Sequence, residues 1–187
     1  MKKSENPSAV RSRKEITEAL LKLMKKYPYS EITVKQIMLE TNLVRKTFYR
    51  NFDSKDDVID SYISDILSNY VKAVTESDSE IPSLIFEFCI RYKDFLLLLH
   101  KNNMFYLLLL KLNSYMPAAH IEISDIENPF SKCFGDLDFD YLIAFNIGAA
   151  WNIISKWVER GMSDPPEQIV STLKSYFNQI VDLKYNL

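Results

Sequence analysis

The stretch from Thr33 to Lys55, TVKQIMLETNLVRKTFYRNFDSK, constrains the fold of this chain more than any other part of the sequence. Thr33 is followed three residues later by Gln36, the pattern of a capping box that begins a helix. A tight turn is expected at Asn42, a residue type that tolerates the left-handed backbone conformation. The pattern therefore predicts two short helices joined by a tight turn.

The second short helix is expected from Val44 to Asn51 and is rich in positive charge. Phe48 and Phe52, four residues apart, give this helix one buried face. The segment 54–57 has the form of a second capping box and should start a longer helix. Together these features form a helix-turn-helix pattern, in which the second helix reads DNA.

The charge distribution agrees with this interpretation. Residues 1–55 hold 13 Lys and Arg against six Asp and Glu, whereas residues 56–187 hold 10 against 19. A basic N-terminal part on an acidic remainder is typical of a DNA-reading domain joined to a body that does not bind DNA. Charge alone would equally fit a solvated basic N-terminus, and the helix-turn-helix spacing makes DNA binding the favoured prediction.

The predicted partner is double-stranded DNA, with contacts of two kinds. Contacts with phosphates position the protein, and contacts with base edges specify the sequence. We expect phosphate contacts from Thr33, Tyr49 and Lys55, added positive charge from Lys46 and Arg50, base contacts from Arg45, Lys46 and Thr47 (Thr47 through a thymine methyl group), and a further contact from Lys35 by position alone.

The segment also resembles the N-terminal DNA-binding domain of the TetR family of bacterial transcriptional regulators. Members typically show a Thr-Val start, an Ile in the first short helix and a Thr-Phe-Tyr-x-x-Phe-x-Ser-Lys run. The matching residues here are Thr33, Val34, Ile37, Thr47, Phe48, Tyr49, Phe52, Ser54 and Lys55, within a resemblance that covers about residues 8–60. The resemblance implies a transcriptional regulator, and a repressor because this family mostly acts by occluding promoters.

Three positions depart from the family pattern. The usual Ala-Gly-Val turn is Thr41-Asn42-Leu43, and a usual Gly or small residue is Lys46. The usual small capping residue at the start of the second helix is Val44, whose side chain cannot cap. These changes alter the expected base preference while adding positive charge where DNA would lie.

Helical spacing of apolar residues extends through the chain and predicts an all-α fold. Only three glycines and no sustained alternating stretch argue against a sheet. Helices are expected at about 8–26, 54–75, 82–100, 103–115, 139–160 and 165–183, with a loop at 116–137 that holds one short helix near 129–134. We predict an N-terminal helix-turn-helix DNA-binding domain at 1–55 and a C-terminal helical regulatory and dimerisation domain at 56–187. The resemblance makes helix 54–75 a lever between the two domains, although a plain connecting helix fits the same pattern.

Helices 139–160 and 165–183 are more apolar than a small body can hide by itself. Gly148 would let a partner helix approach closely, and Trp151 and Trp157 belong to a residue type that anchors interfaces. We predict a homodimer through these two helices, although both could be buried within one chain. A dimer would present two heads to a palindromic operator with half-sites about one DNA turn apart. Residues 157–162 also resemble a TetR subgroup that includes dihydroxyacetone-kinase regulators.

The body could bind an effector, and the sequence leaves its class open. A small-molecule pocket would be lined by Phe88, Tyr92, Met104, Phe105 and Tyr115, although such residues at helical spacing are commonly plain core. The alternative is a helical interaction module controlled by a partner protein. No catalytic motif, metal-ligand spacing or cofactor-binding motif is present, so neither an enzyme nor a cofactor is predicted.

The cellular setting expected from the sequence is cytoplasmic. The N-terminal 14 residues are basic without the apolar segment of a signal peptide, and Cys89 and Cys133 suit a reducing compartment. The apolar stretch 95–112 holds polar residues at its middle, including Lys101, and is too short for a membrane span. No membrane partner is predicted.

Overall fold

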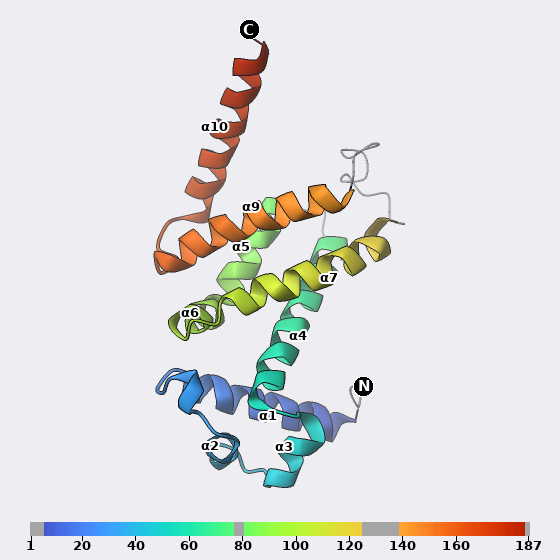
Figure 1. Cartoon of the computed structure of the whole chain (residues 1–187), viewed down its shortest axis with the longest axis vertical. Helices are drawn as coiled ribbons and strands as arrows, with labels where there is room; N and C mark the ends of the chain where they lie inside the picture. The colour runs from blue at the N-terminus through green and yellow to red at the C-terminus, as the bar shows by residue number, and fades with distance from the viewer. Residues whose placement is uncertain (1–5, 77–80, 125–138, 186–187) are drawn as a thin grey trace.

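A computed structural model of the chain describes residues 6–76, 81–124 and 139–185 (Figure 1). Within these residues every regular element is helical, as predicted. The elements are α1 Pro7–Met24, a 3-10 turn η1 at Tyr29–Glu31, α2 Val34–Leu39, α3 Arg45–Asn51, α4 Lys55–Glu76, α5 Ile81–Arg91, α6 Lys93–Lys101, α7 Tyr106–Ser124, α9 Phe139–Glu159 and α10 Pro166–Tyr185.

Helices α1, α2 and α3 form a small head at one end of the molecule (Figure 1). The predicted first helix is present as α1, and Ile16, Leu20 and Met24, spaced four residues apart, are fully buried along it. They share one core with Ile37 of α2 and Phe48 of α3, which are both fully buried. Each short helix is therefore held by burial of its inner face, since helices of this length are marginal alone.

The turn between α2 and α3 differs from the expectation for Asn42. Among the described residues, positive φ angles outside glycine occur at Asn103 and Met162, so Asn42 does not adopt the left-handed conformation. The Thr41 hydroxyl builds the turn instead, because it donates to the Met38 carbonyl at 3.0 Å and accepts from the Leu43 amide at 3.2 Å. A side chain thus supplies the hydrogen bonds that a glycine turn would obtain from its backbone.

Helix α4 runs from the head into the body (Figure 1). It packs against α1 in the head and against α5 and α7 in the body. Val58, Ile59 and Ile63 are almost completely buried along it. The Lys111 ammonium of α7 lies 2.7 Å from the Asp60 carboxylate and adds a polar tie beside this packing.

The predicted helix 82–100 is two helices, α5 and α6, which meet at Tyr92. Tyr92 has φ −106° and ψ 19°, outside the helical region, so the chain changes direction there. The bend lets α5 pack against α4 while α6 packs against α1 and α9, which one straight helix of this length could not do. Sequence spacing alone continues across the bend, and the expectation of one helix was wrong.

Helix α7 continues to Ser124, so the prediction of a loop beginning at 116 was also wrong. The short helix expected near 129–134 lies outside the described residues. No single described helix is long and apolar enough to cross a membrane. The pair Lys93–Lys101 and Tyr106–Tyr115 passes that test of length and composition only together, and it is bent by 119°.

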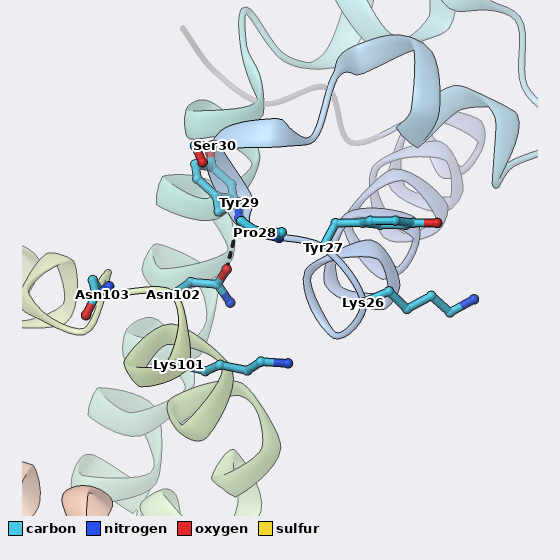
Figure 2. A pocket seen from close by; sticks show the side chains of 8 residues that line it. All are labelled: Lys26, Tyr27, Pro28, Tyr29, Ser30, Lys101, Asn102 and Asn103. Carbon is cyan, nitrogen blue, oxygen red and sulfur yellow. Dashed lines mark hydrogen bonds between the residues drawn. The ribbon is translucent and has the colours of Figure 1, made fainter.

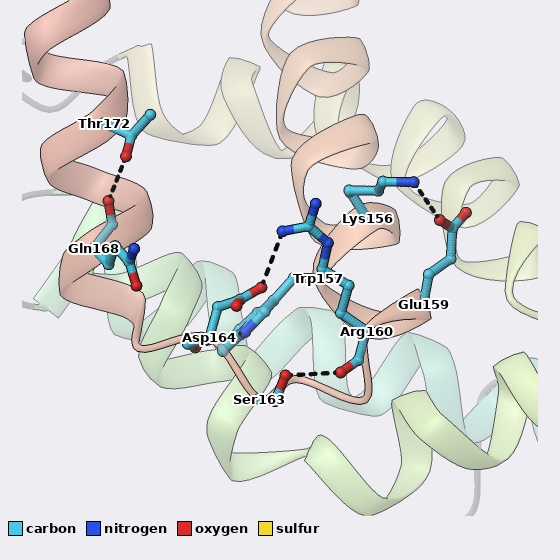
Figure 3. A network of polar contacts seen from close by, with 8 residues as sticks. All are labelled: Lys156, Trp157, Glu159, Arg160, Ser163, Asp164, Gln168 and Thr172. Atoms are coloured by element: carbon cyan, nitrogen blue, oxygen red, sulfur yellow. Dashed lines mark hydrogen bonds and ion pairs between the residues drawn. The ribbon is translucent and has the colours of Figure 1, made fainter.

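Helices α9 and α10 are joined by a tight corner, shown in Figure 3. Gly161 has φ 70°, which confirms the predicted helix end, and the next residue, Met162, is buried at φ 54°. The Trp157 indole donates to the Asp164 carbonyl at 2.9 Å, and Arg160 lies 3.4 Å from the Asp164 carboxylate. These contacts direct α10 away from the body (Figure 1).

Both tryptophans pack on other residues of the protomer, and Trp157 is too deeply buried for the interface role expected of it. Trp157 is 3% exposed and its ring meets Phe86 edge to face, with the ring centroids 5.3 Å apart. Trp151 is half-buried and stacks on Phe105 with centroids 4.7 Å apart. The residues of these helices that remain open to solvent are others: Tyr141, Phe145, Tyr176 and Phe177 are 55–77% exposed.

Candidate nucleic-acid interface

The capping box at the start of α2 is present as predicted. The Thr33 hydroxyl oxygen accepts from the Gln36 amide at 3.3 Å, and the Gln36 side-chain oxygen accepts from the Thr33 amide at 2.8 Å. The hydroxyl itself donates to the same Gln36 oxygen at 2.7 Å. Thr33 is exposed and rigidly placed, although its hydroxyl hydrogen is engaged within the cap.

Helix α3 presents a basic and aromatic face to solvent. Arg45, Lys46, Tyr49 and Arg50 are all exposed, as expected for residues that meet DNA. The Arg45 guanidinium donates to the Tyr49 hydroxyl at 3.2 Å and its carbon lies 5.6 Å from the centroid of that ring. The structure therefore brings these two candidates together in one place, with Arg45 held over the aromatic ring.

The electrostatic setting of this face is positive. Between Thr33 and Phe52 the only acidic residue is Glu40, at the end of α2. The Lys22 ammonium bonds the Glu40 carboxylate and lowers its pKa, chiefly through that hydrogen bond. Lys35 is exposed on α2 and adds a further positive charge. A polyanion approaching the head would thus meet several cations, and this segment holds only one carboxylate to offset their charge.

Two predicted contacts point away from this face. Thr47 is 8% exposed, so little of its side chain is open to a base edge. The Lys55 ammonium donates to three backbone carbonyls, those of Tyr29 at 2.7 Å, Ile32 at 2.8 Å and Ser30 at 3.3 Å. It also lies 4.5 Å from the centroid of the Tyr29 ring. We therefore leave Thr47 and Lys55 out of the proposed DNA-contacting set.

Two exposed apolar residues of the head were missed as candidates. Val44, at the N-cap of α3, is 70% exposed, and Leu39, at the end of α2, is 75% exposed. Neither residue lies in the apolar stripe of its helix, and residues outside that stripe are expected to be polar, so apolar periodicity could not identify them. The sequence signal that could have found Val44 is the absence of a capping side chain at a helix start.

A junction between head and body joins Tyr29 of the head to Asn102 at the end of α6 (Figure 2). The Tyr29 amide donates to the Asn102 side-chain oxygen at 3.0 Å, and the Lys101 ammonium donates to the Lys25 carbonyl at 3.0 Å. The Tyr29 hydroxyl donates to Asp56, and burial together with this bond raises the pKa of that hydroxyl well above its usual value of 10.0. Tyr29 thus remains a hydrogen-bond donor at neutral pH.

The junction also holds an open hollow of about 370 Å³ (Figure 2). Its lining comes from the loop after α1 and from the end of α6, through Lys26, Tyr27, Pro28, Tyr29, Ser30, Lys101, Asn102 and Asn103. Sequence analysis did not predict this contact between head and body, because 73 residues separate Tyr29 from Asn102. No local pattern reports such a pairing.

The five residues expected to line an effector pocket do not surround either this hollow or a second one on α10. Phe88 packs between Tyr70 and Tyr92, with ring centroids 5.3 Å and 5.0 Å away. Phe105 and Met104 are at most 8% exposed, and Tyr115 is half-buried against the same core. These side chains therefore contact neighbouring rings and the core rather than a hollow.

Neither metal binding nor thiol chemistry is indicated in the described part of the chain. Its His, Cys, Asp and Glu side chains include no group of three or more that could hold a metal ion. Cys89 is 1% exposed, and burial raises the pKa of its thiol to about 12. The thiol is thus protonated and unreactive at neutral pH.

Comparisons with known proteins bear on both halves of the chain. The family model for bacterial regulatory proteins of the tetR family matches residues 16–62, and a transcriptional regulator C-terminal region matches residues 80–179. No curated protein matches significantly. Among solved structures, the dihydroxyacetone kinase operon activator DhaS is similar in fold, with a TM-score of 0.57 and 17% sequence identity over 89% of this chain and 96% of that chain.

The junction contacts predict that Lys55 stabilises the fold. Replacing it in Lys55→Met keeps the apolar stem and removes three charge-assisted hydrogen bonds, so the free energy of unfolding should fall by about 1–2 kcal/mol. Urea unfolding followed by circular dichroism measures this change. Lys46→Met, at an exposed lysine, is the matched control and should change it by less than about 0.5 kcal/mol. Unchanged stability of Lys55→Met would return Lys55 to the DNA-contacting set.

Proposed function

Because this chain belongs to the TetR family of bacterial regulatory proteins, we propose that it binds a palindromic DNA operator as a homodimer and represses transcription there. Residues 1–55 would form the DNA-binding domain and residues 56–187 the regulatory and dimerisation domain. The observation that carries the proposal is the exposed basic face of α3. The helix-turn-helix that holds this face has a capping box on α2 and buries its inner side chains in the core of the head.

The proposed DNA contacts follow from exposure and charge. Arg45 and Lys46, in the first turn of α3, would enter the major groove and meet base edges, because recognition helices use their N-terminal residues for this purpose. Tyr49, Arg50 and Lys35 are exposed on the same head and would contact phosphates. Thr33 could join them only if its hydroxyl left Gln36.

The proposed dimer uses the apolar surface that the protomer leaves open on α9 and α10. The first turns of α10 pack on the body through Ile169 and Val170, whereas Tyr176 and Phe177 further along are more than half exposed. On α9, Tyr141 and Phe145 are also exposed, and the open space beside Gly148 would let a helix approach. Burial of such aromatic side chains is the usual source of interface stability.

A second candidate concerns what controls the regulator. Among the predicted pocket residues, Phe88 packs on Tyr92 and Phe105 stacks on Trp151, which supports control by a partner protein over control by a small molecule. Either effector would act by preferring one spacing of the two heads, because an effector shifts a conformational equilibrium only through its differential affinity. Repression remains the proposed output, although the name of DhaS describes that protein as an activator.

DNA binding is tested by fluorescence anisotropy on duplexes from upstream of the gene and from a random-sequence selection, across a salt series. The affinity should fall steeply with salt, and Arg50→Ala, at a proposed phosphate contact, should reduce the slope of log affinity on log salt by about 2 for a dimer. Lys156→Ala, on α9, is the control and should leave the slope unchanged. Transcription from a promoter carrying the selected site should then decrease. An absence of any enriched sequence would contradict the proposed function, and increased transcription would contradict repression.

The proposed dimer interface is tested by introducing negatively charged side chains on α10. The double variant Tyr176→Glu/Phe177→Glu should weaken self-association at least roughly tenfold, because two carboxylates would have to be buried without partners. Analytical ultracentrifugation measures the dissociation constant. Tyr106→Glu, at a residue 55% exposed on α7, is the matched control and should remain dimeric. Dimerisation that survives the α10 substitutions would place the interface elsewhere.

The class of effector is tested with fractions of a cell extract. Operator affinity of the purified dimer should change on addition of the protein fraction and stay constant with the protein-free filtrate of the same extract. Anisotropy with the selected operator provides the measurement, and heat-treated protein fraction is the control. A change produced by the filtrate would overturn control by a partner protein and favour a small molecule.

A further inference from the structure

Val44 combines two properties that are each unfavourable for stability. It is the N-cap residue of α3, with φ −77° and ψ 148°, and its side chain makes no capping hydrogen bond. Ser, Thr, Asp and Asn are strongly preferred at this position, and an aliphatic side chain there leaves helix amides without a local acceptor. The valine is also 70% exposed, so it gains little from burial in the protomer. Nothing within the head accounts for an aliphatic side chain here.

The backbone around Val44 is firmly held. Its carbonyl accepts from the Thr47 amide at 2.8 Å, and the preceding turn is closed by the Thr41 hydroxyl. Leu43, the residue before it, packs against the buried core. A β-branched side chain has little rotational freedom at χ1, so the two methyl groups of Val44 occupy a fixed place in front of α3.

The chemistry of base recognition gives this position a use. Thymine is the one base that presents a methyl group in the major groove, and it is recognised by apolar contact. Thr47, which sequence analysis assigned to this contact, is buried. Val44 instead stands exposed directly before Arg45 and Lys46 at the N-terminal end of α3.

We propose that Val44 is a specificity-determining residue that reads the 5-methyl group of a thymine in each operator half-site. This inference rests on the proposed function, since it requires α3 to lie in the major groove. Arg45 and Lys46 supply charge and hydrogen bonds at the same end of the helix, and Val44 supplies the apolar contact that they lack. The stability lost at the uncapped start of α3 is then the consequence of having a side chain there that recognises a methyl group.

The test replaces single thymines of the selected operator by deoxyuridine, which removes only the 5-methyl group. For the natural protein, one symmetric pair of positions should bind roughly 10-fold more weakly when both half-sites are changed, about threefold for each methyl contact. In Val44→Ala this sensitivity should fall below about twofold, while unmodified operator binds more weakly. Leu39→Ala is the matched control, at the other exposed aliphatic residue of the helix-turn-helix, and should keep the full sensitivity.

A second variant separates recognition from folding. Val44→Ser supplies a capping side chain, so its melting temperature should rise by roughly 2–4 °C while its sensitivity to deoxyuridine is lost. Loss of sensitivity in a more stable protein cannot come from unfolding. A natural protein that binds the operator and tolerates every deoxyuridine, or a Val44→Ala that keeps the sensitivity, would overturn the inference alone. A protein that enriches no sequence would overturn the proposed function and this inference with it.

Discussion

The Lys55 ammonium is the interaction on which the relation between head and body depends. It is the first residue of α4, and it binds the carbonyls of Tyr29, Ser30 and Ile32, which belong to the loop between α1 and α2. The Tyr29 and Ile32 carbonyls are partly buried there, and the ammonium gives each of them, and the more exposed Ser30 carbonyl, a charge-assisted hydrogen bond. The Tyr29 carbonyl also accepts from the Ile32 amide at 3.2 Å. The lysine therefore fixes the start of α4 relative to both helices that carry the DNA-facing surface.

The same loop is bound from the body side. Asn102, at the end of α6, accepts from the Tyr29 amide, and Lys101 donates to the end of α1. Tyr29 thus has its amide bound by α6, its carbonyl by α4 and its hydroxyl by Asp56. A displacement of α6 cannot leave this loop unchanged, since hydrogen bonds have little tolerance in distance and angle. The junction gives the proposed regulation a physical route that does not pass through α4 alone.

Local sequence patterns predicted much of the fold, and their failures share one cause. The capping box at Thr33 and the end of the helix predicted at 139–160 each depend on residues close in sequence, and the structure confirms them. The bend at Tyr92 arises because α5 and α6 pack on different partners, which periodicity cannot report. Burial of Trp157 inside the protomer likewise depends on Phe86, 71 positions away in the sequence.

The candidate site shows the same division in finer detail. Charge and position along α3 correctly placed Arg45, Lys46, Tyr49 and Arg50 on the surface. The family motif gave no means of separating its surface members from its internal ones, and the coordinates place Thr47 in the core and Lys55 in the junction.

That assignment changes how the head is understood. The lysine of the motif holds the helix-turn-helix in shape, because it binds the loop before α2, and the threonine of the motif is largely buried on α3. Residues that maintain the shape of the head cannot vary with the DNA sequence to be read, whereas exposed residues at the start of α3 can. Val44 and Lys46 are both departures from the usual family spelling and both are exposed there. Sequence specificity in this chain is therefore best sought in the residues that depart from the motif.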